Sequence, residues 1–150
     1  MRTIWTVGHS NRSLGEFLEL ISRNRIECVA DIRSFPTSKW EHFKKDALSS
    51  ALKKIGVSYV WLGETLGGFR RGGYLEWMKN ASFSKGLVEL LQLASEKRVA
   101  VMCSERFPWR CHRNLLSRRL ATEKVRVVHI LNMERTYEQK SLISETVTET

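Results

Sequence analysis

Two cysteines stand in sequence contexts that suit thiol chemistry. Cys103 ends an apolar segment and is followed by Ser104 and Glu105, whereas Cys111 is followed at once by His112. A thiol becomes a nucleophile when nearby positive charge or a helix N-terminus lowers its pKa. Chemistry at either cysteine would therefore be that of a thiolate, acting as nucleophile, metal ligand or redox partner.

Other titratable and hydrogen-bonding side chains also follow apolar segments. Asp31 and Arg33 are two residues apart, so they point to the same face of a strand, and His9 ends a different segment. Histidine and carboxylate groups suit acid–base work, and arginine suits phosphate binding. The candidate catalytic residues are His9, Asp31, Cys103, Glu105 and His112. The candidate anion-binding residues are Ser10, Arg33, Arg110 and Arg113.

Most of these residues have a structural alternative. Asp31 and Arg33 also fit a plain ion pair, and His9 also fits a hydrogen bond to a nearby backbone carbonyl. Cys103 fits core packing equally well, because free cysteine behaves as a small hydrophobic residue. Cys28 lies among apolar neighbours, and we expect it in the core.

Composition and charge narrow the function classes. The 150 residues are 42% hydrophobic and 27% charged, which fits one folded domain and excludes disordered and collagen-like proteins. The net charge is +9: residues 1–131 hold 23 basic and 12 acidic side chains, whereas 132–150 hold 2 and 4. Basic side chains are densest between 106 and 126, where a positive field would attract phosphates, nucleotides or nucleic acid. A solvated helix face is an equal interpretation of that run.

The location and partners are predicted only in outline. No apolar run reaches the ~18 residues of a membrane helix, and the first residues lack the apolar stretch of a secretory signal. We therefore expect a cytoplasmic protein without membrane contact. Three cysteines are an odd number and argue against a disulfide framework. An anionic small molecule or nucleic acid is the expected partner, and the sequence determines neither a cofactor nor the oligomeric state.

Apolar periodicity alternates between strand and helix along the chain. We expect strands at residues 3–8, 26–32, 57–62, 98–103 and 125–131, and helices at 14–24, 43–55, from 82 to about 94 and from 108 to about 120. Ser13 and Glu16 have the spacing of a capping box, Gly56 can end the second helix, and a glycine-rich segment at 63–81 is predicted to be a long functional or mobile loop.

This alternation predicts one α/β domain over residues 1–131, followed by a partly flexible C-terminal extension at 132–150. The domain is expected to hold a mostly parallel sheet of about five strands with helices on both faces, a Rossmann-like three-layer arrangement. Ligands of such sheets bind beyond the carboxyl ends of the strands. The candidate residues therefore belong to one predicted pocket at that edge.

The motif-bearing segments together resemble a known family. Gly-His-Ser, Asp-x-Arg, Leu-Gly-Gly and Cys-x7-Cys-His-Arg elements stand in order within residues 6–13, 31–36, 66–68 and 102–113, with 128–130 closing the match. The sequence is similar to the family catalogued as domain of unknown function 488 over residues 3 to 131. The resemblance implies an α/β protein and no settled activity. The segment between Leu66-Gly67-Gly68 and Gly73-Tyr74 is shorter than in many members, so substrate specificity does not carry over.

A weaker analogy connects these motifs with rhodanese-like and cysteine-phosphatase sites. Those sites also combine an Asp-x-Arg at one strand end with a thiol directly after another strand. The glycine and serine spacing that should follow the cysteine is missing here, so the analogy concerns the fold alone.

The first functional hypothesis is an enzyme acting on a phosphate-bearing or other anionic substrate, namely a nucleotide or a nucleic-acid base. In this hypothesis Arg33 and Arg113 bind phosphate, Asp31 orients a histidine, and His9 or His112 transfers protons. Cys103 is then a nucleophile or a polarising neighbour.

Three alternatives stay open at this stage. One is a non-enzymatic nucleic-acid-binding module using the arginine-rich helix at 110–126 with Phe69, Tyr74 and Trp77 for stacking. Another is a zinc or iron site made from Cys103, Cys111 and His112, to which His9 could add, although seven intervening residues match no standard finger. A redox disulfide between the two cysteines is the last.

Overall fold

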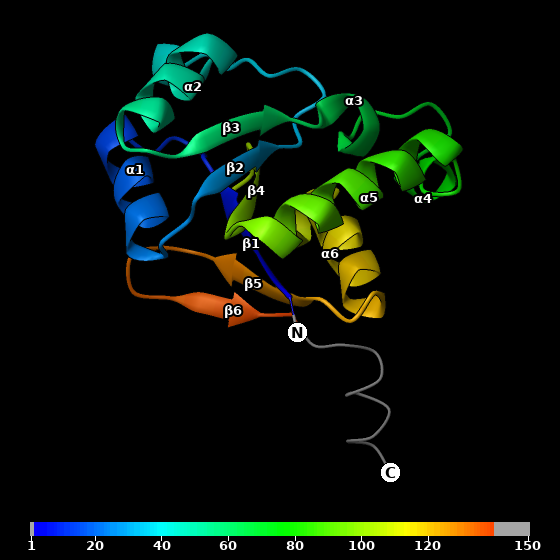
Figure 1. The fold of residues 1–150 in the computed structure, drawn as a ribbon. Helices are drawn as coiled ribbons and strands as arrows, with labels where there is room; N and C mark the ends of the chain where they lie inside the picture. Colours follow the sequence, from blue (N-terminus) through cyan, green and yellow to red (C-terminus); the bar gives the residue numbers. More distant parts are fainter. Residues whose placement is uncertain (1, 140–150) are drawn as a thin grey trace.

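The sheet runs through the middle of the molecule and presents the ends of its strands to one edge (Figure 1). The structure is a computed structural model and describes residues 2–139, except for the side chain of Arg110. Its strands are β1 (Thr3–Gly8), β2 (Cys28–Asp31), β3 (Ser58–Trp61), β4 (Val99–Cys103), β5 (Arg126–Ile130) and β6 (Thr136–Glu138). They lie in the order β3-β2-β4-β1-β5-β6, with all neighbours parallel except β5 and β6. The predicted α/β class with a mostly parallel sheet is confirmed.

Helices cover both faces of this sheet. The α-helices are α1 (Leu14–Arg23), α2 (Lys45–Lys54), α3 (Gly63–Leu66), α4 (Tyr74–Trp77), α5 (Ala81–Glu96) and α6 (Arg113–Thr122), and two 3-10 turns are η1 (Glu41–Phe43) and η2 (Pro108–Arg110). α1 and α2 lie on one face, and α3, α5 and α6 lie on the other (Figure 1). Alternate side chains of each strand point to opposite faces, so each strand serves both layers.

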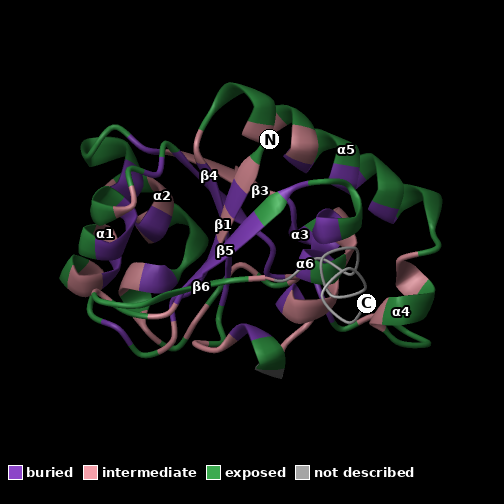
Figure 2. Ribbon diagram, turned by 90° about the horizontal axis from the view of Figure 1, so that it is seen from below, coloured by how far each residue is buried: buried purple, intermediate pink, exposed green. Residues whose placement is uncertain are grey.

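Two apolar cores follow from this layering. On the α1/α2 face, Phe17 and Leu52 pack with Val7 and Met102 of the sheet. On the other face, α5 and α6 place their leucines on Ile4, Val99 and Val101. β1, β2, β4 and β5 are buried along most of their length, β3 is half-buried, β6 is exposed, and the outer sides of the helices are exposed (Figure 2). Strands covered on both faces explain the continuous apolar runs in the sequence.

Several local structures differ from the expectations. The helix expected from residue 108 divides into η2 and α6, and Cys111 and His112 stand in the break between them. The segment 63–81 is not one long loop, because it contains α3 and α4. Asn80, rather than Ser82, caps α5 by accepting the backbone N–H of Ser82.

The predicted signals at other helix ends fit the structure. Ser13 Oγ accepts the backbone N–H of Glu16 at 3.1 Å, as its spacing predicts. Gly56 follows α2 with φ of +79°, the left-handed conformation that glycine adopts without cost.

The C-terminal part of the chain begins as an extension of the sheet. β6 adds an antiparallel edge to β5, through Val128 opposite Glu138 and Ile130 opposite Thr136. Of the extension expected at 132–150, residues 140–150 lie outside the described residues. Within the described part of the chain, no helix has the length and apolar character that crossing a bilayer requires.

Candidate functional site

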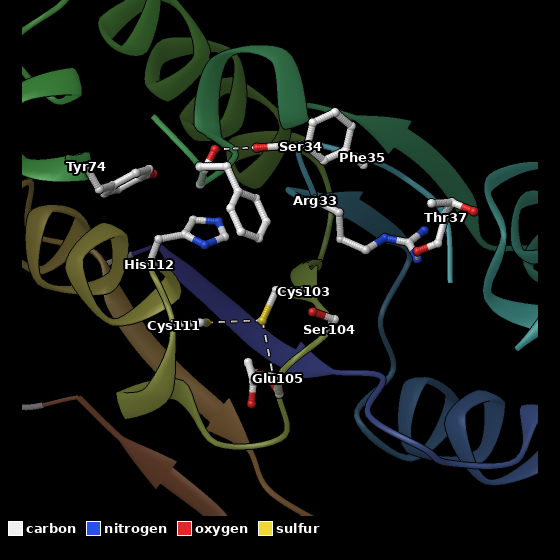
Figure 3. Close-up of a pocket in the computed structure, with 12 residues that line it drawn as sticks. Arg33, Ser34, Phe35, Thr37, Tyr74, Cys103, Ser104, Glu105, Cys111 and His112 are labelled. Carbon is white, nitrogen blue, oxygen red and sulfur yellow. Dashed lines mark hydrogen bonds between the residues drawn. The ribbon is translucent and has the colours of Figure 1, made fainter. Parts of the chain in front are cut away.

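A cavity of about 360 Å³ opens at the carboxyl ends of β2 and β4. Its walls come from three places in the sequence: the segment after β2, the turn after α3, and the β4–α6 connection (Figure 3). The lining residues are Arg33, Ser34, Phe35, Thr37, Gly68, Phe69, Tyr74, Cys103, Ser104, Glu105, Cys111 and His112. This is the edge at which an open parallel sheet binds its ligands.

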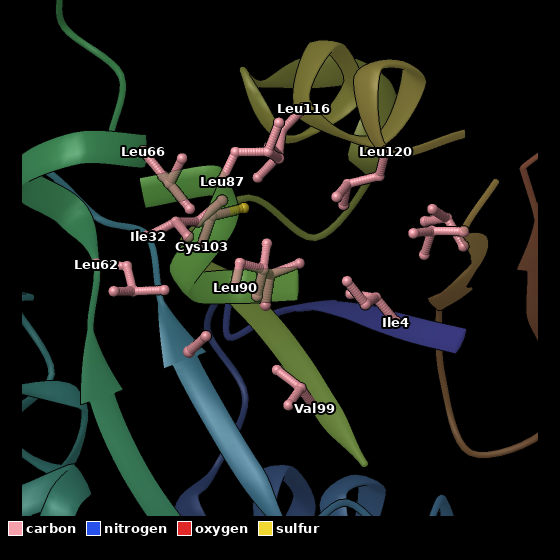
Figure 4. Packing of buried hydrophobic residues seen from close by; sticks show 14 of the residues in the cluster. Ile4, Ile32, Leu62, Leu66, Leu87, Leu90, Val99, Cys103, Leu116 and Leu120 are labelled. Carbon is pink, nitrogen blue, oxygen red and sulfur yellow. The ribbon is translucent and has the colours of Figure 1, made fainter. Parts of the chain in front are cut away.

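The two cysteines of the Cys-x7-Cys-His-Arg element face each other in this cavity. Their Sγ atoms lie 3.3 Å apart (Figure 3). Cys103 ends β4 and packs among Leu66, Leu87 and Leu116 in the apolar cluster (Figure 4). Cys111 is half-buried and its sulfur also accepts the backbone N–H of Arg113 at 3.3 Å.

The pKa values of the two thiols are shifted in opposite directions. The hydrogen bond to Cys111, together with burial, raises the pKa of Cys103 well above that of a free thiol. The same hydrogen bond lowers the pKa of Cys111 to about 7, with burial acting against it and the nearby Arg113 acting with it. Cys103 therefore keeps its proton at neutral pH, whereas Cys111 is about half ionised.

Arg113 is a buried guanidinium with no carboxylate partner among the described residues. Its side chain is fully buried at the start of α6, and one of its nitrogens donates to the carbonyl oxygen of Arg106 at 3.1 Å. Among the described residues, its Nε and Nη1 have no hydrogen-bond partner. A buried charge in this state is costly, so an anion beside it is strongly favoured.

His112 lines the cavity next to the thiols. Burial lowers the pKa of its imidazole to about 4, so the ring is neutral at pH 7. Its Nε2 has no hydrogen-bond partner within the described residues. Gly68 lies against the ring: a Cβ at this position would come within 2.9 Å of His112 Nδ1, so the close approach requires glycine.

A second polar cluster consists of Asp31, Arg33 and Tyr59, and its charged groups all have hydrogen-bond partners. Two Arg33 nitrogens bind the Asp31 carboxylate, Nε at 2.9 Å and Nη2 at 2.7 Å, and Tyr59 Oη donates to the same carboxylate at 2.5 Å. The third nitrogen, Nη1, donates to the carbonyl oxygens of Phe43 at 2.7 Å and Thr37 at 3.2 Å. Asp31 thus holds Arg33 and Tyr59, and the structure gives it no bond to a histidine.

His9 lies on the α1/α2 side of Arg33 and does not line the cavity. Its ring stacks on Phe43 at 4.4 Å between centroids, and its Nδ1 donates to the carbonyl oxygen of Ser10 at 2.9 Å. Burial lowers the pKa of His9 to about 4. Arg33 Nη1 lies 3.4 Å from His9 Nε2.

The backbones after β1 and β4 are joined tightly beside the site. The N–H groups of His9 and Ser10 donate to the carbonyl oxygens of Cys103 and Ser104, each at 2.9 Å. A Cβ on Gly8 would lie 1.7 Å from the carbonyl oxygen of Glu105, so only glycine permits this contact. The Ser10 N–H is consequently occupied, and Ser10 does not line the cavity.

The structure therefore brings together part of the predicted pocket. Arg33, Cys103, Glu105 and His112 line the cavity, as does Cys111. His9, Asp31 and Arg113 are buried outside the lining. The side chain of Arg110 lies outside the described residues.

The three aromatic residues considered for nucleic-acid stacking are placed differently. Trp77 donates its indole N–H to the carbonyl of Thr65 and lies under the Arg70 guanidinium, and Tyr74 donates to the carbonyl of Leu66, so both rings are engaged within the fold, whereas Phe69 is exposed. Across the described part of the chain, no group of three or more His, Cys, Asp or Glu side chains is arranged to hold a metal ion.

Sequence reasoning missed two kinds of site residue. Ser34, Phe35 and Thr37 line the cavity, although the sequence placed the first two only within the matching segment 31–36 and did not single out Thr37. Tyr59 completes the Asp31 cluster from β3, and its register opposite Val29 brings it there. The apolar pattern of β3 marked Tyr59 as a strand residue, and only the strand order could have revealed its partner.

Comparison with known proteins gives one match. The family described as "Domain of unknown function DUF488" matches residues 13–120, which is more than half of the chain and includes Cys103, Cys111 and most of the residues around the cavity. No curated protein and no solved structure matches the chain. The chain belongs to the DUF488 family.

Proposed function

We propose that the protein is an enzyme that acts on a phosphate-bearing or other anionic substrate, a nucleotide or a nucleic-acid base, with the Cys111 thiolate as its nucleophile. The observation that carries this proposal is the thiol pair in the cavity, 3.3 Å between sulfurs, beside the buried and unpaired Arg113. We assign the nucleophile to Cys111 rather than to Cys103, because Cys111 is the less buried of the two and its pKa is lowered, whereas the pKa of Cys103 is raised.

Electrostatics at this edge favour a thiolate and an anionic ligand. Arg33 is neutralised by Asp31, whereas neither Arg106 nor Arg113 has a carboxylate within ion-pair distance among the described residues. Burial and then Arg106 lower the pKa of the Arg12 guanidinium, which reflects the crowding of positive charge there. A thiolate at Cys111 balances only one of these charges, so a ligand with negative charge gains from the remainder.

The two thiols have complementary places in the fold. Cys103 is held rigidly at the end of a central strand, and its S–H stabilises the negative charge on Cys111. Cys111 is less buried and lines the cavity, so a ligand can reach it. Reactive cysteines are typically partly exposed and lie in electropositive surroundings, whereas fully buried ones are inert.

The cavity walls suit a planar ligand. Its volume of about 360 Å³ is at the lower end of small-molecule sites, enough for a nucleoside-sized group. Tyr74 supplies an aromatic wall, Phe35 and Phe69 stand at the mouth, and the neutral His112 can donate or accept a hydrogen bond. Aromatic rings with a few polar groups are the usual setting for a nucleobase.

The test measures thiol reactivity and ligand protection together. Iodoacetamide labelling followed by mass spectrometry is expected to modify Cys111 with an apparent pKa of about 7, and bound nucleoside monophosphates are expected to slow that labelling. Cys28, fully buried in β2, is the internal control and should stay unlabelled in the folded protein.

Two outcomes would contradict the proposal. One is a Cys111 that labels no faster at pH 7 than an ordinary thiol. The other is the absence of nucleotide binding by calorimetry, together with the absence of protection by every mononucleotide. The Cys111→Ser variant should keep nucleotide affinity while losing the labelled peptide, which separates binding from reactivity.

A further inference from the structure

Two segments far apart in sequence, one after β2 and one after α3, contact each other at the mouth of the cavity. Ser34 follows β2 and donates its hydroxyl to the carbonyl oxygen of Gly68 at 2.5 Å. Gly67 approaches Ser34 so closely that a Cβ would lie 2.4 Å from the Ser34 hydroxyl oxygen. Each segment carries one phenylalanine at the mouth, Phe35 and Phe69, with ring centroids 6.2 Å apart. We call these two rings the aromatic rim.

The aromatic rim is exposed to a degree that folding does not explain. Phe35 is 68% exposed and Phe69 is 92% exposed, although phenylalanine normally contributes to stability by burial. Phe69 also adopts φ of +56°, a left-handed conformation that is unfavourable for a bulky side chain. Strain of this kind persists only where the surrounding structure imposes it, and it is common at ligand sites.

The loop that carries Phe69 is braced by its neighbour. The Arg70 guanidinium donates to the carbonyl oxygens of Gly67 at 2.9 Å, Gly63 at 3.0 Å and Glu64 at 2.6 Å. It also lies over the Trp77 ring, 4.0 Å from the ring centroid. The contacts of Arg70 therefore hold the loop in the conformation that exposes Phe69.

Both segments also carry positive charge. The rim phenylalanines are followed by Lys39, Lys44 and Lys45 in one segment and by Arg70 and Arg71 in the other. The acid in the first segment, Glu41, is paired with Lys44 at 2.8 Å. Exposed aromatic rings with interleaved basic side chains are the features by which proteins bind single-stranded nucleic acid, where bases stack on the rings and the phosphates meet the basic groups.

From this arrangement we infer that the aromatic rim is a stacking platform for single-stranded nucleic acid, which presents one base of the strand to the cavity. The inference rests on the proposed function in one respect, namely that the base in the cavity is the substrate of the enzyme. The cavity accommodates one nucleoside-sized group, so the two rings at its mouth are left for the neighbouring bases of the same strand. In a duplex those bases are already stacked on each other and cannot reach the rings.

The test is fluorescence anisotropy with a labelled single-stranded octanucleotide, the matching duplex, and adenosine monophosphate as a competitor. We expect the single strand to bind at low salt, to weaken steeply as salt rises, and to bind at least about tenfold tighter than the duplex. Phe35→Ala and Phe69→Gly are each expected to weaken binding about tenfold, and glycine suits the left-handed position of the loop. Tyr137→Ala, an exposed aromatic on the edge strand β6, is the matched control and should leave affinity unchanged.

Equal affinity for single strand and duplex, an unchanged affinity in both rim variants, or no binding at all would overturn the inference. So would binding of adenosine monophosphate as tight as that of the octanucleotide. Strand binding is measured at equilibrium and needs no thiol reagent. An unreactive Cys111 would therefore contradict the proposed function without affecting the strand-binding result. An absence of strand binding would contradict the present inference without affecting the labelling result.

Discussion

Two buried polar clusters lie at the same edge of the sheet, and they differ in how completely their bonds are made. In the first, Asp31, Arg33 and Tyr59 use every strong donor and acceptor among themselves and nearby carbonyls. In the second, Arg113 leaves two nitrogens without a partner in the described structure, and the pKa of Cys111 is lowered by the Cys103 hydrogen bond and by this guanidinium. The hydrogen bonds of the first cluster are all made, whereas those of the second are incomplete within the described residues.

This difference separates a structural role from a chemical one. A buried network in which every group is paired makes one rigid arrangement and has nothing left for a ligand. An unpaired buried guanidinium costs stability, and such costs concentrate at functional sites. Arg33 and Arg113 were equal candidates for anion binding in the sequence, and their hydrogen-bond partners now distinguish them.

The largest expected effect comes from breaking the complete cluster. Asp31→Asn removes the negative charge and leaves Arg33 buried without a counter-charge. We expect a loss of about 3–5 kcal/mol in the free energy of unfolding, measured by urea denaturation monitored by tryptophan fluorescence. Tyr59→Phe, which removes one hydrogen bond to the same carboxylate, should cost less, about 1.5–3 kcal/mol. A loss below about 1 kcal/mol for Asp31→Asn would mean that the cluster is not a structural unit.

Acid is expected to lower the free energy of unfolding through two buried histidines, His9 after β1 and His129 in β5. Burial lowers the pKa of His9 and of His129 from 6.5 to about 4. Between these values the unfolded chain binds more protons than the folded one, so stability is full above pH 6.5 and falls as the pH drops towards 4. Each imidazole contributes up to about 3 kcal/mol to this loss.

The variants His9→Gln and His129→Gln isolate that contribution. Urea unfolding of each variant between pH 7 and 4 should show a shallower dependence on pH than the unaltered protein, by up to one proton. Parallel curves for variant and unaltered protein would show that these histidines titrate normally in the folded state.

Oxidation should distinguish the thiol pair from the core cysteine. Hydrogen peroxide is expected to oxidise the Cys111 thiolate to a sulfenic acid with release of water. The Cys103 thiol then displaces a second water and forms the disulfide, so the protein loses two hydrogens, ~2 Da by mass spectrometry. Closing this short loop should add about 2 kcal/mol to the free energy of unfolding.

Reduction with dithiothreitol should reverse this bond, and Cys111→Ser should prevent it. Cys28 has no neighbouring sulfur in the described structure and is fully buried, so it should stay reduced. Over-oxidation of Cys111 without a bridge to Cys103 would show that the two sulfurs do not face each other in solution.

Much of the fold was predictable because apolar periodicity reports burial. The strands that are covered on both faces read as apolar runs, and the helices between them show one apolar side. β6 was missed because Thr136–Glu138 is exposed, has no apolar pattern, and is held by backbone pairing to β5. α3 and α4 were missed because four-residue helices flanked by glycines have no periodicity to detect, and contacts such as Trp77 to Thr65 hold them in place.

The site was predictable in residue type and only partly in geometry. That Cys103, Glu105 and His112 belong to one edge follows from the strand-end rule. Their orientation does not, because it depends on where the helix after β4 begins. Placing its start at residue 108 set Cys111 and His112 about 100° apart on a helix, whereas the actual start at Arg113 leaves both in a turn that faces the cavity.

The smallest expected change in stability comes from the incomplete cluster. Arg113→Met replaces a buried unpaired charge with an apolar side chain of similar length, and such replacements are commonly neutral or stabilising. We expect the free energy of unfolding to change by less than about 1 kcal/mol, in contrast to Asp31→Asn. The same substitution removes one of the charges that lowers the pKa of Cys111, so the midpoint of iodoacetamide labelling should rise above 7.

Substitutions at Cys103 sharpen this last test, because its hydrogen bond has the larger effect on Cys111. Cys103→Ala removes the donor and should raise the labelling midpoint more than Arg113→Met does, whereas Cys103→Ser keeps a donor and should hold it near 7. If Arg113→Met were as destabilising as Asp31→Asn, Arg113 would have a full set of bonds in solution. The contrast between a complete and an incomplete cluster would then be lost, and with it the reason to place the chemistry at Cys111.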